Sequence, residues 1–299
     1  KFQIQVPTDS ISCISGHDNM FAVCSWDKSV QLNYLNNKQE ITSQQVVSLS
    51  AYPLCCLFYN DSLLVGCSDS QIYEVNLISL ESSVFFKARG SIRSLHLFKQ
   101  NFLIILTLQN ELIGLNMESS NQVAVELPNR CFSSSLFESQ LLIGTASRKL
   151  LLYNLVQRGD NIEFKLQTQS ESPLRHQTSK VIKIENTSII ASVEGRVSVV
   201  AKQDQFAFRA HKIEDVSYPV TDLALYKQYL ITSGTDGMVY FWDLEKRKKI
   251  YKIEEGSSVK CMMVLKDVLI ICKSYAWENR EMGRKQEQIG VEIIKLDEL

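Results

Sequence analysis

Side chains suited to acid–base or metal chemistry are sparse in this sequence, and their spacing matches no catalytic motif. The four histidines, His17, His96, His176 and His211, are far apart and have no partner at ligand spacing. The chain contains no G-x-S-x-G, H-E-x-x-H or G-x-G-x-x-G motif. The stretch Gly144–Lys149 is similar to a phosphate-binding loop but lacks the second glycine and the Ser or Thr after the lysine. The sequence therefore predicts a protein that is not an enzyme and that uses no metal or cofactor.

A different set of residues is spaced to form a hydrogen-bonded relay. The strand-like runs Val220–Leu225, Tyr229–Ser233 and Met238–Trp242 follow one another, and an Asp-Gly pair separates the last two. Such a pair favours a hairpin, because the turn needs a positive φ that glycine adopts without strain. A histidine before the first run, a serine in the second, the turn aspartate and the final tryptophan could bond in series: these are His211, Ser233, Asp236 and Trp242. This pattern is typical of a WD-repeat blade, and it predicts a structural role for the histidine.

The same strand pattern recurs along the chain. Its units contain apolar runs of five to seven residues that alternate or run continuously, as strands do. Six turn positions align at spacings of 38 to 47 residues: Asp27, Asp69, Gln109, Ser147, Glu194 and Asp236. These spacings bracket the roughly 40–45 residues of WD repeats, and a seventh unit begins at Val259. We therefore predict an all-β, seven-bladed WD40 β-propeller that forms a single domain over residues 1–299.

Two segments at the ends of the chain depart from the repeat. The segment Lys1–Val6 alternates apolar and polar residues like an isolated strand and precedes Pro7. Because a propeller must avoid exposed sheet edges, we expect this N-terminal strand to become the outer strand of blade seven and close the ring. The insertion Ala276–Gly290 in blade seven is rich in charged and amide residues, which predicts a mobile loop rather than a site.

The composition predicts a soluble intracellular protein without a global charge bias. The chain has 32 basic and 33 acidic residues and a net charge of −1, so no strong field attracts nucleic acid or a membrane. The longest apolar runs are too short to cross a bilayer. The eight cysteines are scattered through apolar strand segments without a C-x-x-C pair, which indicates buried thiols in a reducing compartment.

Ordered short motifs in the second half of the chain resemble one family of WD-repeat proteins. The motifs EGRVSVV, FAFRAHK, YPV, SGTDG and FWDL, in this order, are similar to those of the mitotic-checkpoint adaptors of the Bub type and of the related mRNA-export propellers of the Rae/Gle type. The resemblance implies a non-catalytic adaptor of the nucleus and kinetochore. Its partners would be a checkpoint kinase or pseudokinase carrying a Gle-type binding segment, and phosphorylated repeats of the kinetochore scaffold. The alternative is a nuclear-pore mRNA-export factor that docks on a nucleoporin.

Four residues are candidates for partner binding. Trp26, at a turn of blade one, is either a half-buried turn aromatic or a binding anchor, since tryptophan and arginine are favoured in binding hot spots. Arg196 and Arg209 are either solvated ends of strands or binding residues: they lie in the EGRV and FAFR motifs, and in the related family the matching Arg of EGRV and basic residues around FAFR line a surface that receives acidic peptides. Lys227 is the weakest candidate, because blade topology places its hairpin on the opposite rim. The family usually has a second Ser-Trp-Asp in blade three, where this chain has Thr107-Leu108-Gln109.

Overall fold

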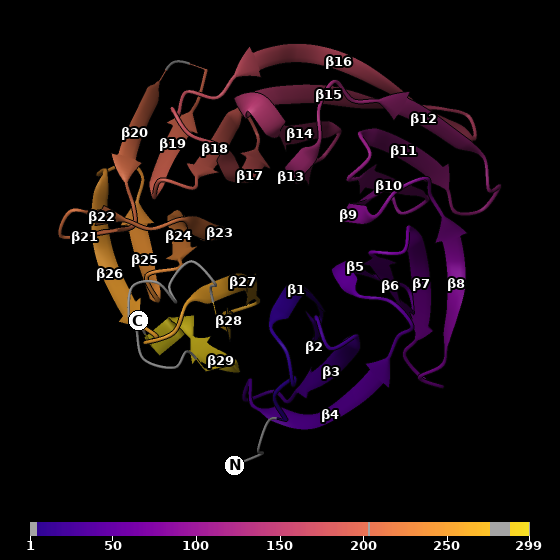
Figure 1. Ribbon diagram of the computed structural model, residues 1–299, viewed down its shortest axis with the longest axis horizontal. Coiled ribbons are helices and arrows are strands. Elements are labelled where there is room, and N and C mark those ends of the chain that lie inside the picture. The colour runs from indigo at the N-terminus through magenta and orange to yellow at the C-terminus, as the bar shows by residue number, and fades with distance from the viewer. Residues whose placement is uncertain (1–4, 203, 276–287, 299) are drawn as a thin grey trace.

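The computed structural model describes residues 5–202, 204–275 and 288–298, and its main sheets form a ring (Figure 1). Six antiparallel sheets of four strands and one described with three strands surround a central channel. In each sheet the strand order follows the chain from the centre of the ring outward, so that each sheet is one blade. The predicted seven-bladed all-β propeller is therefore confirmed.

The blades follow one another in the sequence. Blade one contains β1 (Ile11–His17), β2 (Met20–Ser25), β3 (Ser29–Leu35) and β4 (Ile41–Ser48). Blade two contains β5 (Pro53–Tyr59), β6 (Ser62–Cys67), β7 (Gln71–Asn76) and β8 (Ser82–Lys87). Blade three contains β9 (Ile92–Phe98), β10 (Phe102–Thr107), β11 (Glu111–Asn116) and β12 (Gln122–Glu126). Blade four contains β13 (Cys131–Phe137), β14 (Gln140–Thr145), β15 (Lys149–Arg158) and β16 (Asn161–Glu171).

The second half of the ring begins with blade five, which contains β17 (Thr178–Ile184), β18 (Thr187–Ser192), β19 (Arg196–Val200) and β20 (Gln205–Arg209). A small hairpin of β21 (Lys212–Ile213) and β22 (Val216–Ser217) follows. Blade six contains β23 (Val220–Tyr226), β24 (Tyr229–Gly234), β25 (Met238–Asp243) and β26 (Lys248–Glu254). Blade seven contains β27 (Val259–Leu265), β28 (Val268–Lys273) and β29 (Gly290–Lys295). Two short 3-10 turns are η1 (Ala146–Arg148) and η3 (Leu296–Glu298), and no helix in the described ranges is long and apolar enough to cross a membrane.

Apolar side chains fill the seams between neighbouring blades. Each pair of adjacent blades shares one buried cluster, including the pair formed by blades seven and one. The second strands carry most of this packing, and every residue of β6 and β10 is buried. Outer strands such as β12 instead alternate exposed and half-buried residues, because only one of their faces covers the blade. Burial of these seams on both faces of the middle strands explains their continuous apolar runs.

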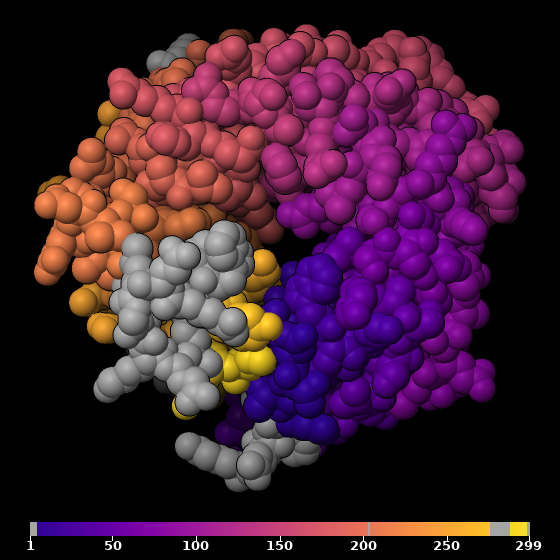
Figure 2. All heavy atoms as spheres, in the orientation of Figure 1, coloured from indigo at the N-terminus to yellow at the C-terminus, as the bar shows by residue number. Residues whose placement is uncertain are grey.

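Each blade has two ends, which place its turns on two rims of the ring. Within a meander, the turns between the first and second strands and between the third and fourth strands lie at one end. We call this end the lower rim. The turn between the second and third strands, and the connection to the next blade, lie at the other end, which we call the upper rim. Figure 2 shows that the centre of the ring is hollowed on the face turned toward the viewer.

The two end segments are described only in part. Residues 1–4 lie outside the described residues, and Gln5 and Val6 form no strand. Gln5 instead exchanges two hydrogen bonds with the side chain of Gln44 in β4, at 2.9 and 3.0 Å, so its described contacts are with blade one and not with blade seven. Of the insertion expected to be a mobile loop, residues 276–287 lie outside the described part, and Gly290 already begins β29.

Candidate functional site

Arg196 and Arg209 lie side by side on the upper rim of blade five. Arg196 begins β19, Arg209 ends β20, and the two are directly opposed in the strand register. Because opposed residues in an antiparallel pair project from the same face of the sheet, both guanidinium groups belong to one surface. The EGRV and FAFR motifs, which are separated in the sequence, thus form a single basic site.

The turn before Arg196 fixes the position of this pair. The carbonyl oxygen of Gly195 accepts hydrogen bonds from the backbone N–H groups of Ala210 and His211, at 2.8 and 3.0 Å. Gly195 has a φ of +75°, and a Cβ at this position would collide with the carbonyl oxygen of His211. Glycine is therefore required both by the conformation of the turn and by the close approach of the loop that follows Arg209.

The two arginines differ in their surroundings. The Nε atom of Arg196 lies 4.0 Å from a carboxylate oxygen of Glu194, whose other oxygen lies 3.2 Å from Nε2 of the exposed His176. Arg209 is exposed, and among the described residues it has no carboxylate within ion-pair distance. Like charges directly opposed on neighbouring strands destabilise a sheet. Glu194 neutralises only Arg196, so Arg209 is left able to bind an anion.

His211, Asp236 and Trp242 lie in one hydrogen-bonded chain in blade six, and its hydroxyl comes from Thr232. His211 Nδ1 lies 2.9 Å from Asp236 Oδ1, and Nε2 lies 3.0 Å from Thr232 Oγ1. The indole N–H of Trp242 donates to the same hydroxyl oxygen at 3.0 Å. The expectation that Ser233 fills this place is wrong. Successive strand residues point to opposite faces, and Ser233 bonds to Thr221 Oγ1 on the other side of β24.

A histidine between a carboxylate and a hydroxyl is the arrangement of a catalytic triad, but burial prevents that use here. The side chains of His211 and Asp236 are 0% exposed. The Thr232 hydroxyl is also occupied by the Trp242 indole and lies inside the sheet. A nucleophile needs a substrate within reach, and this hydroxyl has no route to one. The chain of bonds instead fastens the loop after blade five to the turn and third strand of blade six.

Trp26 lies on the upper rim of blade one and is 39% exposed. Its ring packs against that of Tyr52 in a tilted arrangement, with a centroid separation of 5.7 Å and an interplanar angle of 41°, and Lys28 Nζ lies 5.0 Å from the centre of the Tyr52 ring. Tyr52 and Lys28 were not predicted from the sequence, since a lone Tyr between blades and a turn lysine give no pattern. In Figure 1, β3 and β19 lie on opposite sides of the ring, so Trp26 and the arginine pair form two separate patches of one rim.

Lys227 lies in the turn between β23 and β24, which places it on the lower rim. Its Nζ lies 4.7 Å from the centre of the Tyr226 ring and 3.9 Å from a carboxylate oxygen of Asp297. It therefore lies at the opposite end of its blade from the rim that carries Arg196, Arg209 and Trp26. No contact of the described residues joins Lys227 to that rim.

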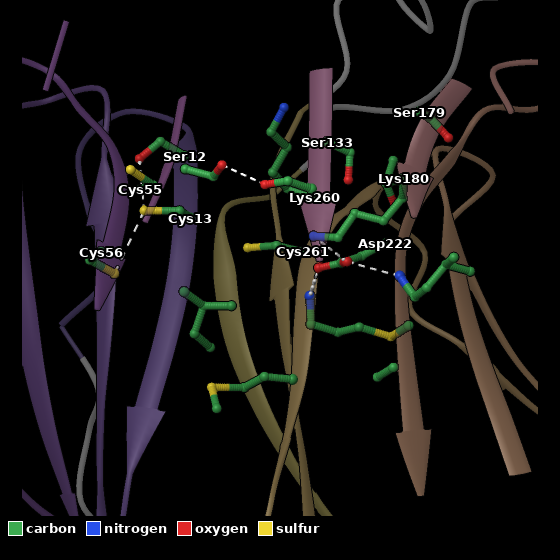
Figure 3. Close-up of a pocket in the computed structure, with 18 of the residues that line it drawn as sticks. Ser12, Cys13, Cys55, Cys56, Ser133, Ser179, Lys180, Asp222, Lys260 and Cys261 are labelled. Atoms are coloured by element: carbon green, nitrogen blue, oxygen red, sulfur yellow. Dashed lines mark hydrogen bonds and ion pairs between the residues drawn. The ribbon is translucent and has the colours of Figure 1, made fainter. Parts of the chain in front are cut away.

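The inner strands of all seven blades line a central cavity of about 530 Å³ (Figure 3). Lys180 forms an ion pair with Asp222 at 2.8 Å, and Asp222 also accepts a hydrogen bond from the backbone N–H of Met262. Arg93 and Lys260 add positive charge to the wall, and hydroxyl groups supply most of the remaining polar atoms. Sulfur atoms cluster on the side of the cavity that blades one and two form.

Comparison with known proteins adds to this geometry. Residues 2–32 and 203–243 match the family described as WD domain, G-beta repeat. Over 96% of its length the chain is 26% identical to mitotic checkpoint protein BUB3.1 of Arabidopsis thaliana and spans 91% of that protein. It is also 26% identical to protein Rae1 of Drosophila melanogaster, over 85% of this chain and 81% of that protein. Over most of its length the chain is thus similar to the Bub/Rae type of WD-repeat propellers.

Solved structures agree on the fold. The structure of U3-55K superimposes with a TM-score of 0.75 at 11% identity, and covers 90% of each chain. At this identity the likeness concerns the propeller alone. The Bub/Rae propellers are non-catalytic scaffold proteins, which accords with the closed environment of the His211 relay. The likeness to these proteins supports a scaffold or adaptor role for this propeller, in which its rims and its channel carry the function.

Proposed function

We propose that this WD-repeat propeller is an adaptor of the Bub/Rae type that captures an acidic segment of a partner protein on the upper rim of blade five. The observation that carries the proposal is the opposed pair Arg196 and Arg209, of which Arg209 has no acidic partner among the described residues. Two guanidinium groups on one face can each bind a carboxylate or phosphate through two parallel hydrogen bonds. Arginine serves this role better than lysine, because its planar group has a fixed geometry.

Trp26 supports a second contact on the same rim. A half-exposed tryptophan packed against a tyrosine offers apolar area to a partner, while Lys28 above the tyrosine offers a positive charge. Tryptophan is among the residues that contribute most to protein interfaces. We therefore assign Trp26 to a second partner contact on the other side of the ring. This rim contact is separate from Lys227, which we exclude from the interface because it lies on the lower rim.

The checkpoint branch of the family supplies the preferred partners. Relatives include proteins named for the mitotic or spindle assembly checkpoint in Arabidopsis thaliana, Dictyostelium discoideum and Schizosaccharomyces pombe. The acidic segment is then the Gle-type binding segment of a checkpoint kinase or pseudokinase. Phosphorylated repeats of a kinetochore scaffold are the second partner, which places the protein at the kinetochore in the nucleus.

A second candidate has comparable support. Protein Rae1 of Drosophila melanogaster has the same identity as the first checkpoint relative, and related proteins are named as mRNA export factors. In that case the acidic segment belongs to a nucleoporin, and the protein lies at the nuclear pore. Both branches require the same basic site, so they differ in the partner and not in the residues that bind it.

Titration of two fluorescent peptides tests the proposal: one carries the checkpoint-kinase segment and the other the nucleoporin segment. We expect Arg196→Ala and Arg209→Ala each to weaken binding by about 2–4 kcal/mol, because a charged hydrogen-bonded contact is lost. Arg209→Lys should restore only part of the loss. Lys227→Ala on the lower rim is the matched control and should leave binding unchanged.

The outcome also separates the two branches. Binding of the kinase peptide supports the checkpoint adaptor, and binding of the nucleoporin peptide alone replaces it with the export factor. If neither peptide binds the wild-type protein at micromolar concentration, the adaptor proposal is wrong. Equal losses from Lys227→Ala and Arg209→Ala would show that the contact is non-specific electrostatic attraction rather than a site on blade five.

A further inference from the structure

Three cysteine side chains meet at the wall of the central channel. Cys13 in β1 is the register partner of Cys24 in β2, and Cys56 comes from β5 in the neighbouring blade. Within the described residues this is the one group of three or more His, Cys, Asp or Glu side chains whose ligand atoms all lie within 4.8 Å of one another. The three thiols are dispersed in the sequence, so the ring geometry and not a motif brings them together.

The sulfur separations fit a metal–thiolate site. The Sγ atoms of Cys13 and Cys56 lie 3.8 Å apart, as the dashed line in Figure 3 shows. With metal–sulfur bonds of about 2.3 Å, two ligands are separated by about 3.8 Å in a tetrahedral site and about 4.0 Å in a trigonal one. The distances in the trio, none above 4.8 Å, therefore need only small side-chain rotations to reach ligand geometry.

The surroundings of the trio are rigid on one side and open on the other. Cys24 is fully buried, within the apolar cluster that joins blades one and two. Cys13 and Cys56 are half-buried and line the central cavity. An ion in the channel can thus reach two of the sulfur atoms directly, while the third lies behind them in a fixed position. Rigid elements that hold ligands in place favour binding over collapse of the site.

Cys55 is a natural comparison for the trio, because it is a neighbouring thiol that lies outside the cluster. It neighbours Cys56 in the same strand and is equally half-buried, but strand alternation places its side chain on the opposite face of β5. Its thiol lies 3.9 Å from the carbonyl oxygen of Ile92, on the side of blade three. Cys55 is therefore a thiol of the same strand and exposure that is absent from the cluster.

We propose that Cys13, Cys24 and Cys56 form a binding site for a thiophilic d10 cation, either Zn²⁺ or Cu⁺. Soft thiolate ligands select these two ions over magnesium, calcium and manganese. Cu⁺ accepts three thiolates in a trigonal arrangement, whereas Zn²⁺ would add a water molecule from the channel as its fourth ligand. Each thiol that binds releases its proton to solvent, so affinity rises with pH.

Metal titration of the reduced 299-residue chain under argon tests this site. Zn²⁺ is added in competition with a chromophoric chelator, Cu⁺ in competition with a Cu⁺-specific chelator, and Co²⁺ serves as a spectroscopic probe of the Zn²⁺ geometry. We expect one equivalent to bind, and the Co²⁺ form to show a thiolate-to-metal charge-transfer band. For each ion, the affinity of the protein is compared with that of the competing chelator. The ion for which this ratio is larger is assigned as the occupant.

Alanine variants locate the site. Cys13→Ala and Cys56→Ala should each weaken binding more than about tenfold, since loss of even an outer-sphere partner commonly costs 10–100-fold. Cys55→Ala is the matched control and should bind as the wild type does. Cys24 is buried, so its variant is used only if its circular dichroism and thermal melt without metal match those of the wild type.

Two results would overturn the proposal. One is the absence of stoichiometric binding for both ions. The other is binding that Cys55→Ala weakens as much as Cys56→Ala does. A metal-induced rise in the melting temperature of the wild type, lost in Cys56→Ala but kept in Cys55→Ala, would support the site independently of the spectroscopy.

Discussion

His96 lines the central channel, and the shift of its pKa makes the stability of the fold depend on pH. Its Nε2 lies 2.8 Å from the hydroxyl of Ser134 in the next blade, and that hydroxyl also lies 2.6 Å from Ser94 Oγ. Burial, and then the nearby positive charge of Lys180, lower the pKa of His96 from 6.5 to about 4. The folded protein therefore keeps this ring neutral at pH values where the unfolded chain protonates it.

The sign of the pH dependence follows from this shift. Between pH 6.5 and about 4 the unfolded state binds a proton that the folded state does not, so stability falls as the pH falls through this range. Because the ring is partly accessible from the channel, we expect a loss of about 1–2 kcal/mol rather than the full effect of the shift. His96→Gln should flatten the dependence measured by urea denaturation at pH 4.5 and 7. His17→Gln, which removes an exposed histidine from another blade, is the comparison variant.

Thr232 shows where sequence reasoning fails at the scale of one residue. The sequence predicts a relay with a hydroxyl in the second strand of blade six, and two adjacent residues, Thr232 and Ser233, offer one. Only the face to which each side chain points distinguishes them, because strand residues alternate. The register pairs Leu230 with Trp242, which puts Thr232, two residues on, on the face of the indole. That register depends on the turn geometry, which the Asp-Gly signal indicates without fixing the first paired residue.

The turn that begins β19 decides whether the arginine pair exists as a site. Gly195 combines a positive φ with backbone atoms of the next loop on its Cα side. Gly256, at the end of blade six, has a similar φ of +71°, but no atom of the described residues lies within 4 Å of the position that a Cβ would occupy there. Substitution at Gly256 therefore measures the cost of backbone conformation alone, whereas substitution at Gly195 adds the cost of a steric collision.

Gly195→Ala should destabilise the protein more than Gly256→Ala does. Both substitutions force a non-glycine residue into a positive φ, which costs about 1 kcal/mol. Only the first also displaces the carbonyl groups of His211 and Tyr218, and we expect a further loss of about 1–3 kcal/mol. Denaturant midpoints of both variants measure the difference. Peptide titration of Gly195→Ala should also show weaker binding, and equal midpoints for the two variants would contradict this account.

At the scale of elements, the sequence predicts the repeat of the blades better than it predicts strand register or the position of the terminal segment. The spacing of the turns identifies the blades even where the relay residues are absent, because buried strands need apolar runs whatever the turn chemistry. The opposition of Arg196 and Arg209 depends on the register of β19 with β20, and that register has no sequence signal of its own. The position of Lys1–Val6 depends on contacts across the ring, and the described Gln5 meets blade one.

The ring as a whole has seven seams, and six of them are crossed by the chain. The seam between blades seven and one is held by side chains and hydrogen bonds: a shared apolar cluster, the bond from Ile11 N to Ser274 Oγ and the bond from Tyr275 to Asp9. A connecting loop keeps two packed blades at high effective concentration after a local opening. This seam has no such loop among the described residues, so it should open more readily for a given loss of packing.

Two isoleucines at equivalent positions test this inference. Ile11 begins the inner strand of blade one and Ile92 that of blade three; both are fully buried, and each packs in the cluster shared with the preceding blade. Either change to alanine should lower global stability by about 2–5 kcal/mol through the cavity it leaves. Amide hydrogen exchange should differ: Ile11→Ala should accelerate β1 and β27 selectively, because the unlinked seam opens locally. Ile92→Ala should leave exchange in β5 and β9 limited by global unfolding. The same exchange pattern in both variants would contradict the inference, because the seam without a connecting loop would then open no more readily than the others.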